Sequence, residues 1–69
     1  MPLTMIKVGD SGQIQRIIGT QDIRHHLENL GFILGENVTV VNEMAGNLIV
    51  NVKDSRIALS KVLASKIFV

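Results

Sequence analysis

The sequence TQDIRHHLENLGFILG at residues 20–35 decides the fold, because it is the stretch of the chain whose apolar spacing is helical. Ile23, Leu27 and Leu30 follow one another at i, i+4 and i+7, which places them in one narrow stripe facing a core. Thr20 is a fair N-cap, because its hydroxyl can accept a hydrogen bond from a free N–H of the first turn. The stretch therefore predicts one amphipathic helix that begins after Thr20.

The end of this helix is predicted from its glycine. If Gly31 adopts the left-handed conformation just after the helix, Phe32 and Leu27 become the pair of residues that make the hydrophobic contact of a Schellman ending. Residues 33–36 then form a type II turn, with Gly35 at the position that needs a positive φ. We therefore expect structural roles for Leu27, Leu30, Gly31, Phe32 and Gly35.

The rest of the chain reads as strands and turns. Residues 1–11 look like a lead-in that ends in a turn cluster at 9–12. Residues 60–65 can form one turn of helix, and the predicted connections between strands are a hairpin loop at 44–47 and a two-residue turn at 53–54. Strands are expected at 12–18, 36–43, 48–52, 56–59 and 66–69.

Five short strands and one helix, spaced by turn signals, predict a mainly β fold with one inserted α-helix. The expected architecture is a small, partly open β-barrel of about five strands. With 69 residues, the chain has room for one compact core and not for two, so residues 1–69 are expected to form a single domain.

Composition excludes several classes of function. The chain has no cysteine, which excludes disulfides and thiolate chemistry, and a net charge of +1, which argues against a protein that binds nucleic acid through phosphates. Residues 1–7 lack a basic start followed by a long apolar run, so no secretory signal is expected. Hydrophobic residues make up 46% of the chain, which is more than so small a core needs. We therefore expect an exposed contact surface, with Leu34 and Met44 at turn tips as its candidates.

His25 and His26 are the weak candidates for a metal site. Adjacent helical side chains point about 100° apart, so the two imidazoles need ligands from other segments to share an ion. Asp22 lies four residues before His26 and can approach it. Because ligands from one element rarely fill a coordination shell, we expect a solvated helix face and no bound metal or other cofactor.

Catalysis and base stacking have no visible basis in the sequence. The serines lack the sequence context of a nucleophile elbow, and the carboxylates are scattered. The chain has no Trp or Tyr, so it offers neither a groove for proline-rich peptides nor a platform for stacked bases. We expect neither an enzyme nor a nucleic-acid-binding protein.

The pattern Leu-x-x-Leu-Gly-Phe-x-x-Gly-x-x-Val-x-Val at residues 27–40, followed by Ile-Ala-Leu at 57–59 and Ile-x-Val at 67–69, resembles the ferrous iron transport protein A (FeoA) family. The spacing Gly9-x-x-Gly12-x-Ile14 and the basic Arg24 also fit. The resemblance implies an SH3-like β-barrel in the cytoplasm that is not an enzyme. It also implies a partner, the FeoB-like ferrous iron permease, whose GTPase domain would bind any nucleotide.

The sequence departs from the family pattern at its turns. Leu34 stands where the family usually has proline, the loop at 44–47 is shorter than usual, and the turn at 53–54 lacks the common glycine. Similar barrels occur at the C-terminus of metal-dependent repressors, which keeps a metal-sensing domain as an alternative. No DNA-binding segment precedes the barrel here, so a complete repressor is not expected.

The sequence thus favours an accessory protein of ferrous iron uptake that binds the permease and modulates its assembly or GTPase activity. Its expected contact residues are Arg24, His25, Leu34 and Met44. A metal-sensing domain and, more remotely, a nucleic-acid-binding barrel are the alternatives. Self-association is also open, since Val41, Ile49 and the last strand can pair with another copy.

Overall fold

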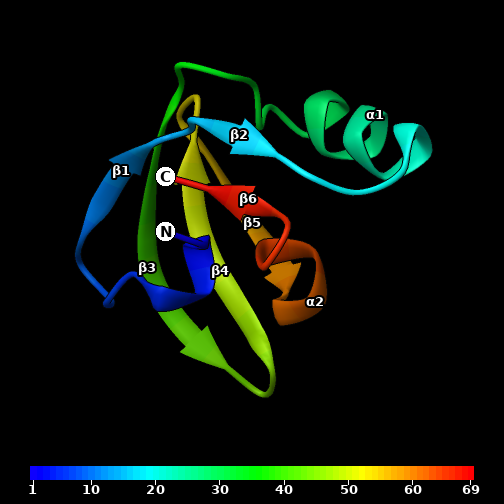
Figure 1. Ribbon diagram of the computed structural model, residues 1–69. Coiled ribbons are helices and arrows are strands. Elements are labelled where there is room, and N and C mark those ends of the chain that lie inside the picture. The colour runs from blue at the N-terminus through cyan, green and yellow to red at the C-terminus, as the bar shows by residue number, and fades with distance from the viewer.

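The strands of this chain fall into two antiparallel sheets. The larger sheet has the order β1-β3-β4-β5, and the smaller one pairs β2 with β6. Figure 1 shows the sheets curving into a partly open barrel, with α1 standing out on one side. The computed structural model describes residues 1–69, and its elements in order are η1 (a 3₁₀ turn, Leu3–Met5), β1 (Ser11–Gln13), β2 (Arg16–Ile17), α1 (Gln21–Asn29), β3 (Asn37–Met44), β4 (Asn47–Val52), β5 (Ser55–Ser60), α2 (Lys61–Ala64) and β6 (Ile67–Phe68).

This architecture confirms the predicted mainly β fold, with one main helix inserted between strands and a barrel that does not close. The prediction of a single strand over residues 12–18 is wrong, because β1 and β2 belong to different sheets. Ile14 lies between them and is buried. Its N–H donates to the carbonyl of Glu36 and its carbonyl accepts from the N–H of Gly35, so this residue leaves the strand ladder and turns the chain. The strands therefore number six, not five.

The lead-in at residues 1–11 holds more structure than its sequence indicates. Leu3 is fully buried in the 3₁₀ turn. Pro2 forms an isolated bridge with Phe68, and the N–H of Val69 donates to the carbonyl of Met1 at 2.8 Å. The two chain ends therefore lie side by side, and the lead-in contributes to the core.

The core is built by alternation along the strands. Every second side chain along these strands is buried, namely Val38 and Val40 on β3, and Leu48, Val50 and Val52 on β4. A β-bulge follows Val40, since Val40 pairs with Val50 but Asn42 pairs with Ile49. Val41 is thus the extra residue, and the bulge bends β3 as it leaves the core. The predicted self-association through these strands stays a prediction.

The predicted loop at 44–47 is wrong in its extent. Met44 and Asn47 pair with each other at the ends of β3 and β4, which leaves a two-residue turn. Ala45 and Gly46 have φ angles of 50° and 80°, as a type I′ hairpin turn requires. The turn at Lys53 and Asp54 has the same handedness, with φ angles of 49° and 62°, and its prediction is confirmed.

Both predicted ends of α1 are confirmed. The Thr20 hydroxyl oxygen accepts from the N–H of Ile23 at 3.2 Å. At the other end, the N–H of Gly31 donates to Glu28 at 2.9 Å and the N–H of Phe32 donates to Leu27 at 3.0 Å, which is the Schellman pattern. Gly31 has a φ of 107°, and both Leu27 and Phe32 are fully buried.

The turn after the helix also follows the prediction. The N–H of Glu36 donates to the carbonyl of Ile33 at 3.1 Å, and Gly35 has a φ of 88°. Together the Schellman ending and this turn bury Phe32 and leave Leu34 in solvent, with 67% of its surface exposed.

Gly12 supplies a first testable consequence of this packing. A Cβ added at Gly12 meets the Cβ of Val69 at 2.8 Å, so the C-terminal strand would have to shift. We expect Gly12→Ala to lower the free energy of unfolding by about 1–3 kcal/mol, the usual cost of overpacking. Urea denaturation followed by circular dichroism measures this change.

A rescue experiment controls for an unspecific effect at Gly12. Changing Val69 to Gly removes both its Cβ and its methyl groups, so Gly12→Ala should cost less in the Val69→Gly background than in the wild type. Equal costs in the two backgrounds would show that Val69 is not the cause.

Candidate partner-binding groove

A groove of about 370 Å³ lies between α1 and β2. One wall comes from the helix, the other from the start of the smaller sheet, and the turn that follows α1 closes its rim. The lining residues are Gln15, Arg16, Ile17, Gln21, Arg24, His25, Glu28, Ile33 and Leu34. The groove thus combines charged, polar and aliphatic side chains from three segments of the chain.

The helical wall follows from the periodicity of α1. Gln21, Arg24, His25 and Glu28 lie at i, i+3, i+4 and i+7, so they share one side of the helix. All four are exposed, whereas Leu27 on the neighbouring stripe is fully buried. The helix therefore anchors itself through its apolar stripe and presents the adjacent polar stripe to the groove.

The opposite wall is held by the pairing of β2 with β6. Arg16 pairs with Phe68 and Ile17 with Ile67. The guanidinium carbon of Arg16 lies 4.6 Å from the centre of the Phe68 ring, which is a cation–π contact. This contact restrains an otherwise flexible side chain beside the groove.

The charges of the groove are unpaired within the chain. The ion pair that the structure forms joins Lys61 to Glu43, at the start of α2, and involves no residue of the groove. Arg24 and Glu28 are four residues apart on α1, yet they make no ion pair. The guanidinium of Arg24 is therefore free to bind another anion.

The structure brings together Arg24, His25 and Leu34, three of the four predicted contact residues. It does not bring Met44 to them. Met44 ends β3 beside the hairpin turn, at the opposite end of the barrel from α1 (Figure 1), with 57% of its surface exposed. The predicted contact residues therefore form two separate surfaces.

Sequence reasoning missed the β2 side of the groove. The sequence predicts Arg16 and Ile17 inside one strand over residues 12–18, which hides their position opposite α1. The hydrogen bonds of Ile14 to Gly35 and Glu36 create this arrangement. An imperfect alternation in residues 12–18 was the one available signal that the strand breaks.

The two histidines of α1 lie differently. His25 lines the groove and His26 does not, although both are exposed. Asp22 makes no ion pair with His26. No group of three or more His, Asp or Glu side chains is placed to surround a metal ion.

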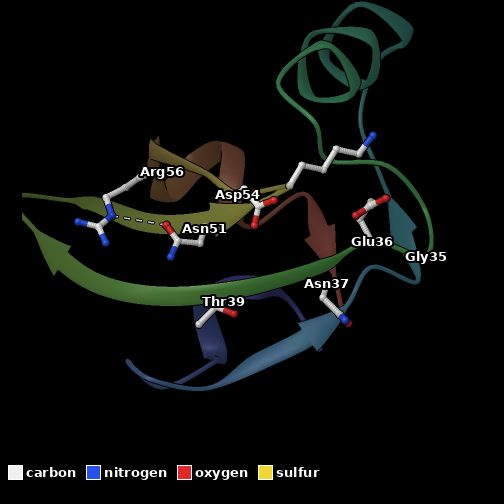
Figure 2. Close-up of a pocket in the computed structure, with 8 residues that line it drawn as sticks. Gly35, Glu36, Asn37, Thr39, Asn51, Asp54 and Arg56 are labelled. Atoms are coloured by element: carbon white, nitrogen blue, oxygen red, sulfur yellow. Dashed lines mark hydrogen bonds between the residues drawn. The ribbon is translucent and has the colours of Figure 1, made fainter.

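A second hollow, of about 750 Å³, lies on the outer face of the larger sheet. Its lining is wholly hydrophilic and carries charges of both signs: Gly35, Glu36, Asn37, Thr39, Asn51, Lys53, Asp54 and Arg56. Figure 2 shows the bond that the Arg56 Nε donates to Asn51 Oδ1, at 3.5 Å, on the opposite side of the hollow from Glu36. This hollow offers no apolar side chain to anchor a partner, unlike the groove between α1 and β2.

Residues 1–69 match the family model of the FeoA domain over their whole length. The chain belongs to the FeoA family. FeoA proteins are accessory proteins of ferrous iron transport, and the resemblance read from the glycine and aliphatic pattern is confirmed.

Solved structures of FeoA proteins have the same fold. An iron uptake regulatory protein (FeoA) is 28% identical, with a TM-score of 0.90 over 97% of this chain and 91% of that one. The zinc-bound FeoA of Stenotrophomonas maltophilia, described as a prokaryotic SH3 domain protein, is 27% identical, with a TM-score of 0.86 over 99% of this chain and 87% of that one. The SH3-like architecture is therefore confirmed.

The barrel is also similar to part of a larger protein. A manganese-dependent transcriptional repressor is 24% identical, with a TM-score of 0.89 over the whole of this chain and 40% of that one, which shows a shared fold. A search of curated protein sequences gives no significant match. No helix of this FeoA-family chain is long and apolar enough to span a membrane.

Proposed function

We propose that this FeoA-family chain is a non-catalytic cytoplasmic protein that binds the FeoB-type ferrous iron permease and modulates its assembly or GTPase activity. The observation that carries the proposal is the groove, where the exposed Leu34 stands beside the unpaired guanidinium of Arg24 and the imidazole of His25. Family membership supplies the link to ferrous iron transport. The permease as partner is the further step that we propose.

Leu34 is the anchor of this proposed contact. Leu34 has 67% of its surface exposed, and burying it against a partner is favourable by about 1.5–3 kcal/mol. Arg24 and His25 lie on the rim beside it. An apolar centre with a polar rim is the usual anatomy of a protein–protein interface.

Met44 offers a second, independent contact. Its thioether is flexible and adapts to irregular partner surfaces. Because it lies at the far end of β3, it would contact another part of the permease or a different molecule. Substitutions at Leu34 and Met44 therefore distinguish the two surfaces.

Capture of the permease tests the proposal. The tagged chain is incubated with the cytoplasmic portion of the permease from its own organism, and then with the full-length permease in detergent. We expect capture by the wild type and its loss with Leu34→Asp, because a buried carboxylate opposes an apolar contact. Met44→Asp is the matched control at the other end of the barrel, and circular dichroism verifies that both variants fold.

The outcomes separate the surfaces. Loss only with Leu34→Asp places the contact at the groove, and loss only with Met44→Asp places it at the hairpin end. No capture with or without nucleotide or Fe²⁺ would contradict the proposed partner. Metal titration of the His25 and His26 variants would then test the metal-sensing alternative.

A further inference from the structure

We propose that the groove binds a short acidic segment of its partner protein, in which a carboxylate side chain lies close to an aliphatic or aromatic one. This inference rests on the proposed function in one respect, namely that the partner is the permease. The chemistry of the segment is argued from the groove itself.

The charge of the groove selects for carboxylates. Arg16 and Arg24 stand on its opposite walls, His25 adds a further donor, and Glu28 is the one carboxylate among the lining residues. A guanidinium presents donors in a planar fork that matches a carboxylate with two parallel hydrogen bonds. An acidic side chain between the walls would meet a guanidinium on either side.

Arg16 is already positioned for this role. Its guanidinium rests over the Phe68 ring, and its backbone is fixed by pairing with β6. A side chain restrained before binding loses less conformational entropy when the partner arrives. Arg24 extends from the exposed side of α1 and has no partner within the chain.

The aliphatic residues of the groove set the second requirement. Ile17 and Ile33 are half-buried and Leu34 is exposed, so they give an apolar contact next to the guanidinium groups. A purely acidic segment would leave this surface in water. An aliphatic or aromatic side chain close to the carboxylate covers it.

The size of the groove suits a short segment. Its volume of about 370 Å³ lies within the roughly 300–1,000 Å³ of ligand clefts, which is room for a few side chains of a partner. Nucleic acid is disfavoured, because two arginines and a net charge of +1 give few phosphate contacts.

The test uses labelled short peptides and fluorescence anisotropy with the intact chain. One set tiles the cytoplasmic segments of the permease. Two designed peptides of equal length contain Leu and Gly with either Glu or Lys. We expect the Glu peptide and the acidic permease peptides to bind, and the Lys peptide not to bind. Raising the salt should weaken binding, since the Debye length falls from about 30 Å at 0.01 M to about 8 Å at 0.15 M.

Variants locate the binding at the groove. Arg24→Glu should weaken the binding of the Glu peptide at least about tenfold, and Arg24→Lys should weaken it less, because the charge stays and the fork is lost. Arg56→Glu makes the same charge reversal at the polar hollow of the sheet and is the matched control. Arg56→Glu should bind the Glu peptide as the wild type does, although its net charge equals that of Arg24→Glu.

The outcomes distinguish this inference from the proposed function. If the chain captures the permease but Arg24→Glu and Arg56→Glu bind alike, the acidic-segment inference is wrong and the permease contact stands. If the permease is not captured but the Glu peptide binds and Arg24→Glu abolishes that binding, the groove chemistry stands without the permease. Equal binding of the Glu and Lys peptides, or stronger binding of a single-stranded oligonucleotide, overturns the inference.

Discussion

Replacing Leu27 with alanine is expected to lower the free energy of unfolding by about 2–5 kcal/mol, the range for truncating a buried leucine. Leu27 is fully buried and belongs to the apolar stripe that holds α1 to the barrel. Its carbonyl also accepts the N–H of Phe32 in the Schellman ending. At roughly 0.05–0.15 kcal/mol per residue, a domain of 69 residues has about 3–10 kcal/mol in total. The variant should therefore lose a large share of the total stability of the domain.

Leu34→Ala is the matched control for this prediction, because it makes the same chemical change at an exposed leucine seven residues away. Its free energy of unfolding should stay within about 0.5 kcal/mol of the wild type. Urea denaturation followed by circular dichroism measures both variants. Equal losses at the two positions would contradict the role assigned to Leu27.

Replacing Phe32 with alanine is expected to cost about 3–5 kcal/mol, because it leaves a cavity where the largest fully buried side chain stood. Phe32 follows Gly31, whose φ of 107° turns the chain at the end of α1. Its ring then enters the core together with Leu27. Losing the ring should therefore loosen both the helix ending and the barrel, and with them the groove between α1 and β2.

Phe68→Ala tests whether this cost comes from burial or from aromatic character alone. Phe68 is half-buried and stacks under Arg16, so its truncation should lower the free energy of unfolding by less than that of Phe32. Thermal and urea denaturation compare the two variants. An equal or larger loss for Phe68→Ala would overturn the assignment of Phe32 as the main core residue.

Local patterns predicted the parts of this fold that depend on neighbours in the sequence. The N-cap at Thr20, the Schellman ending at Gly31 and the turn at Gly35 all arise from hydrogen bonds between residues a few positions apart. The inward faces of β3 and β4 follow from the strict alternation of side chains in a strand. Such features need no knowledge of the rest of the chain.

The predictions failed where a distant segment decides the structure. Residues 12–18 look like one strand, yet Ile14 bonds to the turn at Gly35 and Glu36 and separates β1 from β2. Leu3 has no periodic neighbours, yet the core buries it completely. Met44 looked like a loop tip, but pairing with Asn47 extends the strand through it.

The candidate site shows the same division. The sequence determined that Arg24 and His25 lie on the exposed side of α1 and that Leu34 occupies a turn, because helix periodicity and turn geometry are local. Only the tertiary structure decided that these residues face Arg16 and Ile17 across a groove, and that Met44 lies at the other end of the barrel. The physical reason is that the pairing of β2 with β6, about fifty residues away in the chain, sets the position of the second wall.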